Sequence, residues 1–103
     1  MWATLAVLVL LMQASDFAAD GLKALGTGEY AAAVEAFRKA VAADPSDYSA
    51  HFNLALAYGF LMRDEDGIAE YRRTLELKPG LYEAELNCGM LLLRRKEIGR
   101  AHV

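Results

Sequence analysis

Few residues in this sequence have the type and spacing that catalysis or metal binding requires. The single cysteine, Cys88, lies among apolar residues, where a thiol is usually a small buried hydrophobe and not a nucleophile. His51 has no Cys, His or acidic partner at the spacing of metal ligands. No Ser/His/Asp set and no pair of carboxylates stands out. The sequence therefore predicts no enzyme, no metal site and no cofactor.

Two short motifs look like ligand loops but lack the residues that would complete them. Gly26-Thr27-Gly28 follows a helical pattern and has no lysine to contact a phosphate. Asp64-Glu65-Asp66-Gly67 begins like a calcium loop, but Arg73 and Thr74 occupy the place of its closing Glu. We interpret the first motif as a turn and the second as the solvated start of a helix.

Two asparagines, Asn53 and Asn87, are the polar pair with the most suggestive spacing, 34 residues apart. A carboxamide both donates and accepts hydrogen bonds, so it can bind a peptide backbone; the alternative is that each bonds locally. Pro45 and Pro79 have the same separation, and each follows an amphipathic segment. A fixed period of this length is typical of an array of helix–turn–helix units, which would place both asparagines at one repeat position.

The repeat resembles the tetratricopeptide repeat (TPR) family, whose first helix carries a large residue, Leu, a small residue and Tyr. Its second helix carries a small residue and an aromatic, and Pro closes the unit. The matching residues of the first unit are Phe17, Asp20, Gly21, Ala24, Ala33, Phe37 and Pro45. Those of the second are His51, Leu54, Ala55, Tyr58, Gly67, Tyr71 and Pro79. The resemblance implies an all-α fold, an α-solenoid of antiparallel helix pairs forming a right-handed superhelix.

The resemblance divides the chain into repeat 1 at 16–47, repeat 2 at 48–81, and the first helix of a truncated repeat 3 at 82–97. Small residues at Gly21, Ala55 and Gly89 would let paired helices approach closely. Phe37 and Tyr71 would fill the space between neighbouring pairs.

The family presents a concave groove lined by the first helices, and the resemblance places the partner-binding residues there. They are Phe52, Asn53, Leu56, Phe60, Leu86, Asn87, Met90 and Arg94. Some relatives bind acidic chaperone tails through Lys, Asn and Arg. The matching positions here are Ala18, Leu22, Asn53, Glu83 and Asn87. Since none is basic, the sequence disfavours a chaperone-tail ligand.

The chain starts with an apolar run from Trp2 to Met12, too short to span a bilayer but typical of the apolar part of a signal peptide. No Lys or Arg precedes it, so Met1 need not be the native start. We predict a signal peptide at 1–15 and a secreted or periplasmic protein of an exported, bacterial type. The alternatives are a membrane anchor, if the segment stays uncleaved, or a packed helix in a cytoplasmic protein.

The last residues, 98–103, do not continue the repeat. Ile-Gly-Arg-Ala-His-Val can be encoded by ATC GGA AGA GCA CAC GTC, which looks like a sequencing adaptor read in frame. We interpret this segment, His102 included, as an artefact, and the third repeat as truncated before its second helix.

The charge balance, 11 Lys and Arg against 14 Asp and Glu, gives a net −3 and argues against nucleic-acid binding, which needs a basic face. The sequence predicts a scaffold that binds a protein or peptide along the groove. The alternative is a docking or regulatory segment at the N-terminus of a larger enzyme.

Overall fold

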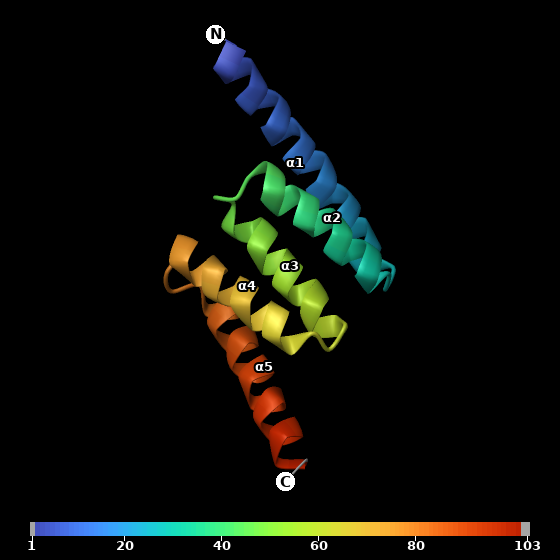
Figure 1. Ribbon diagram of the computed structural model, residues 1–103, viewed down its shortest axis with the longest axis vertical. Coiled ribbons are helices and arrows are strands. Elements are labelled where there is room, and N and C mark those ends of the chain that lie inside the picture. Colours follow the sequence, from blue (N-terminus) through green and yellow to red (C-terminus); the bar gives the residue numbers. More distant parts are fainter. Residues whose placement is uncertain (1, 102–103) are drawn as a thin grey trace.

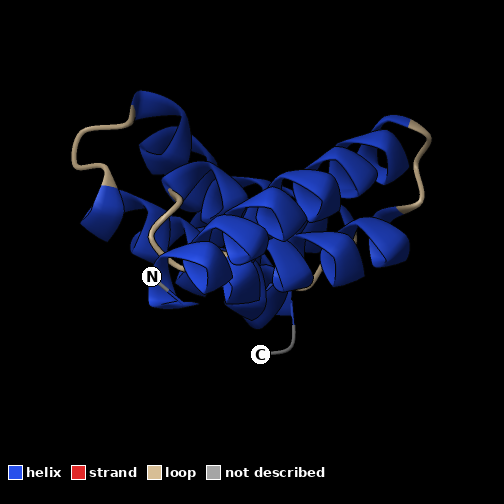
Figure 2. Cartoon of the chain, turned by 90° about the horizontal axis from the view of Figure 1, so that it is seen from above, coloured by secondary structure: helices blue, strands red, loops and turns tan. Residues whose placement is uncertain are grey.

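The computed structural model describes residues 2–101, with side chains through Gly99. Five helices follow one another: α1 (Trp2–Gly26), α2 (Tyr30–Ala43), α3 (Tyr48–Phe60), α4 (Asp64–Leu77) and α5 (Tyr82–Ala101). Each helix packs antiparallel to the next, so that α1 with α2 and α3 with α4 form two pairs and α5 lies against α4 (Figure 1). The described residues contain only helices and loops (Figure 2). The predicted all-α solenoid of helix pairs is confirmed.

The turns follow from residues that recur at the repeat spacing. Asp47 precedes α3, and its carboxylate accepts the Ser49 backbone N–H at 3.0 Å, as expected of a helix N-cap. α2 and α4 both end two residues before a proline, which has no N–H to continue the helix. Gly28 and Met62, 34 residues apart, both have a positive φ, of 78° and 62°. The same left-handed turn therefore follows the first helix of each pair.

The core consists of two clusters, each centred on an aromatic residue of a second helix. Phe37 on α2 is completely buried and packs with Leu54 and Tyr58 of α3. Tyr71 on α4 packs in the same way with Cys88 and Leu91 of α5. Both aromatics therefore join one pair to the next, as predicted, and Cys88 is a buried core residue.

Each pair has one glycine where its two helices meet, but on opposite helices. In the first pair it is Gly21 on α1; a Cβ there would lie 2.5 Å from the Phe37 ring. In the second pair the glycine is Gly67 on α4, where a Cβ would lie 3.3 Å from the Ala55 carbonyl oxygen and 2.8 Å from a Leu91 methyl. A Cβ at Gly89 on α5 would meet nothing within 4 Å. The close approaches predicted at Gly21 and Ala55 are therefore present, whereas Gly89 has no second helix of its own repeat among the described residues and its prediction stays open.

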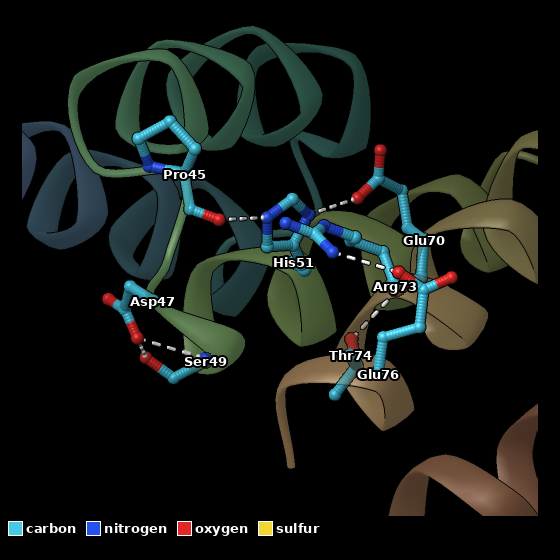
Figure 3. Close-up of polar contacts among 8 residues, drawn as sticks. All are labelled: Pro45, Asp47, Ser49, His51, Glu70, Arg73, Thr74 and Glu76. Atoms are coloured by element: carbon cyan, nitrogen blue, oxygen red, sulfur yellow. Dashed lines mark hydrogen bonds and ion pairs between the residues drawn. The ribbon is translucent and has the colours of Figure 1, made fainter. Parts of the chain in front are cut away.

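A buried histidine ties the two pairs together (Figure 3). His51 on α3 is 5% exposed; its Nδ1 lies 2.6 Å from a carboxylate oxygen of Glu70 on α4, and its Nε2 lies 2.8 Å from the Pro45 carbonyl oxygen. The Pro45 carbonyl can only accept, so Nε2 donates to it, and Nδ1 pairs with the Glu70 carboxyl group. The ring thus links the turn between α2 and α3 to the second helix of the next pair.

The two end helices are longer than the repeat requires. The predicted boundary between 15 and 16 falls inside α1, which continues without a break, and the side chains of residues 2–13 are exposed. α1 is the one helix among the described residues that is long and apolar enough to cross a membrane, a test that a signal sequence also passes. α5 continues past Lys96 to Ala101. Met1, His102 and Val103 lie outside the described residues, so only part of the predicted 98–103 segment is described.

Candidate functional site

The cavity that gathers most of the predicted groove residues lies between α3 and α5 and has a volume of about 200 Å³; for that reason we call it the main cavity, although others are larger. Its lining is mostly apolar, and Tyr71 of α4 joins it from between the two helices. The lining residues are Leu56, Gly59, Phe60, Tyr71, Asn87, Met90, Leu91 and Arg94. Five of these, Leu56, Phe60, Asn87, Met90 and Arg94, belong to the groove predicted from the sequence. We call the cleft between α3 and α5 the α3–α5 furrow.

Asn87 lies beside the Tyr71 phenol in this cavity. Burial raises the pKa of that phenol, and the neighbouring Asn87 carboxamide partly lowers it again. Since Asn87 also lines the cavity, its carboxamide can donate to and accept from a ligand there. Whether Asn87 contacts a ligand or bonds only locally stays a prediction.

Arg94 lines the same cavity but is already bound within the protein. Its Nε donates to Asp64 Oδ2 at 2.8 Å, and its Nη2 donates to Asp64 Oδ1 and, at 2.9 Å, to the Gly59 carbonyl oxygen. The hydrogen bond to Asp64 raises the pKa of Arg94. Asp64 is therefore more than the start of α4, because its carboxylate also compensates the charge of the Arg94 guanidinium. This ion pair fixes α5 to the α3–α4 turn.

Phe60 connects the cavity to the first pair. Its ring stacks on Tyr30 of α2, with centroids 4.6 Å apart and planes 9° apart, although the residue remains 53% exposed. The stack holds the Phe60 ring at the cavity rim, so this apolar contact is preorganised for a ligand.

A second cavity of about 300 Å³ lies in the furrow near the N-terminal ends of α3 and α5. It is lined by Tyr48, Phe52, Leu81 and Glu83, so the predicted residue Phe52 lies here and not in the main cavity. The Phe52 ring meets Tyr71 edge-on, with centroids 5.7 Å apart. Phe52 thereby stands between the two cavities.

The remaining predicted residues, Asn53 and Leu86, line neither of these two cavities. Asn53 is half-buried and Leu86 is 48% exposed. Sequence reasoning did not assign Tyr71 or Leu91 to the site, because both are core residues by repeat position. Sequence reasoning considered Glu83 only as one of the positions where relatives carry residues that bind an acidic chaperone tail. Glu83 shares a helix face with Asn87, four residues on, and this spacing could have identified it.

The geometry thus defines a helical-repeat protein with an apolar furrow between successive first helices, and comparison with known proteins agrees. A family model described as TPR repeat matches residues 26–59. DnaJ homolog subfamily C member 3 of Rattus norvegicus is 31% identical over 81 residues, which cover 79% of this chain and 16% of that protein. The tetratricopeptide repeat and J domain-containing co-chaperone DNJ1 of Cryptococcus neoformans is 24% identical over 88 residues, which cover 85% of this chain and 17% of that protein.

A solved structure, the TPR2B domain of yeast Sti1 in complex with pHsp70, has the same fold, with a TM-score of 0.80 at 23% identity. The match covers 87% of this chain and 72% of that one. Residues 26–59 thus match the TPR repeat family, and the fold is that of a TPR-like helical solenoid, as the sequence predicted. The chain spans about a sixth of the length of the two relatives named above. These relatives are a rat and a fungal protein, so export and a bacterial type remain predictions.

Proposed function

We propose that the protein is an interaction scaffold that binds a peptide segment of a partner protein in the α3–α5 furrow. The observation that carries this proposal is the main cavity, where five residues predicted from repeat position meet around apolar space. Burying one large apolar side chain of a ligand there would contribute about 1.5–3 kcal/mol. The name of the Cryptococcus relative, which describes a co-chaperone, supports a partner that is itself a protein.

Met90 provides the sharpest test, because it lines the cavity yet is 60% exposed, so that its replacement leaves the core intact. Met90→Asp should weaken binding of peptides from a displayed random library by about ten-fold or more, since it places a charge in the apolar contact. Met62→Asp is the matched control, because Met62 is 59% exposed and lies in the α3–α4 turn, outside the cavity lining. Equal binding by both variants would rule out the furrow as the site.

We further propose that residues 2–15 direct export, which would place the scaffold outside the cell or in a periplasm. Two facts support this: Trp2 to Met12 form an almost unbroken apolar run, and the side chains of residues 2–13 are exposed instead of packed. Mass spectrometry of the mature protein tests the proposal. A terminus at Ser15 or Asp16 is expected, whereas retention of the segment in a membrane fraction would indicate an anchor.

A further inference from the structure

We propose that the furrow selects partner segments in which a lysine or arginine stands two or three residues from a large apolar side chain. The apolar side chain occupies the main cavity, and the cation lies against Glu83 in the second cavity. This inference rests on the proposed function and adds to it the chemistry of the ligand.

Glu83 is a carboxylate in an aromatic setting. It lines the second cavity together with Tyr48 and Phe52. Among the side chains that the structure describes, residues 2–99, no ion pair involves Glu83. A carboxylate attracts a cation through its charge. The Lys78 ammonium already lies 5.8 Å from the centroid of the Tyr48 ring, so a ligand cation would pair with Glu83 and not with that ring. This end of the furrow therefore favours a positively charged side chain.

In the part of the chain that the structure describes, the opposite end of the furrow offers no free positive charge that could attract an acidic ligand. Its cation, Arg94, is 33% exposed and is bound to Asp64, whose side chain is 9% exposed. A partner carboxylate would have to compete with Asp64 for the guanidinium, and at the other end it would face Glu83. The furrow therefore disfavours acidic segments at both ends.

The spacing within the ligand follows from helix geometry. Leu56 of the main cavity is one turn from Phe52, and Met90 is seven residues from Glu83. At about 1.5 Å of rise per residue, the two cavities are offset by about 6–10 Å along the helices. An extended chain covers about 3.3 Å per residue, so two or three residues of the ligand span that offset.

The test uses the full chain and fluorescein-labelled peptides with blocked ends, each built on a library-selected peptide whose binding Met90→Asp weakens, with one central Leu and its charged residues replaced by Ser. A single Lys, Gln or Glu is placed at each other position, and binding is measured by fluorescence anisotropy at physiological salt. At two or three residues from Leu, Lys should bind about two- to five-fold tighter than Gln, and Glu more weakly than Gln, as for an exposed ion pair.

Two matched variants locate the effect. Glu83→Gln should abolish the preference for Lys over Gln while binding of the Gln peptides persists. Glu85→Gln removes the same charge two residues away, on the opposite face of α5, and should keep the preference. Neither glutamate is buried, so both variants should fold.

Each outcome decides between the two levels of the proposal. Binding of all peptides with equal affinity overturns the charge preference and leaves the scaffold function standing. Loss of the preference in both variants also overturns the proposed role of Glu83, since the net negative charge of the protein would then be responsible for the preference. Failure of every peptide, or self-association of the chain in sedimentation that blocks peptide binding, overturns the furrow as a partner site and this inference with it.

Discussion

Gly21 and Gly89 occupy the same repeat position, 68 residues apart, yet the same substitution should act on them in opposite directions. A Cβ at position 21 would lie 2.5, 2.6 and 2.8 Å from three Phe37 ring carbons, whereas favourable carbon contacts lie at about 3.5–4.0 Å. The ring would have to move by about 1 Å to restore such a contact. Phe37 is 0% exposed, so no free space is open to it.

The magnitude follows from two opposing effects. Overpacking a core costs about 1–3 kcal/mol, and the immobile ring places Gly21→Ala in the upper part of that range. Replacing a glycine inside a helix by alanine stabilises it by about 0.5–1 kcal/mol. Gly21→Ala should therefore destabilise the fold by about 1–2 kcal/mol and lower the melting temperature by roughly 5–15 °C. Gly89→Ala creates no clash and gains only the helix stabilisation, so it should raise the melting temperature by roughly 2–8 °C.

Thermal unfolding followed by circular dichroism at 222 nm measures both variants. The double variant Gly21→Ala/Phe37→Leu separates the clash from other causes. Phe37→Leu alone should destabilise the fold. In the Gly21→Ala background the same substitution should destabilise it by at least about 0.5 kcal/mol less, because the smaller Leu side chain leaves room for the new Cβ. Additive effects, or a raised melting temperature for Gly21→Ala, would refute the close approach of α1 and α2.

Three further predictions concern polar contacts and the turn. Glu70→Ala should destabilise the protein by about 1–3 kcal/mol in urea unfolding, since it leaves buried His51 with an unsatisfied ring nitrogen, whereas Glu76→Ala on the same helix should leave the midpoint unchanged. Met62→Gly should stabilise it by about 0.5–1 kcal/mol in the same assay, because an L-residue at φ 62° is strained; an unchanged midpoint would contradict this. Burial raises the pKa of Tyr71, so its neutral phenol stabilises the fold fully below pH about 10 and loses that effect as the pH rises through the raised pKa. Tyr71→Phe should therefore flatten the fall of the melting temperature above that pH, and an equally steep fall would count against the burial.

The repeat period predicted the helices, their pairing and most of the main cavity. Leu56, Phe60 and Met90 could be assigned because the faces of α3 and α5 follow from helix periodicity and from one shared register. The division of the furrow into two cavities could not, since it depends on where the rings of Phe52 and Tyr71 lie.

Polar contacts between helices escaped sequence reasoning for a different reason. His51 and Glu70 are 19 residues apart within repeat 2, and Asp64 and Arg94 are 30 apart and join repeat 2 to α5; neither separation is a multiple of the repeat. One repeat earlier the same positions hold Phe17 with Ala36 and Tyr30 with Phe60, which carry no matching charges, so periodicity gives no signal for either polar pair. The predicted role of Asp64 as a helix start was incomplete because the sequence does not show that α5 returns to this turn.

The binding site is not built from the same pair of helices as the sequence repeat. The family match at 26–59 covers α2 and α3, and repeat 2 covers α3 and α4, but the cavity needs the facing sides of α3 and α5. A single repeat thus holds only half a site, and binding capacity belongs to the joints between repeats. A gene fusion or an expression boundary placed at Pro79 would therefore divide the site while leaving repeat 2 whole.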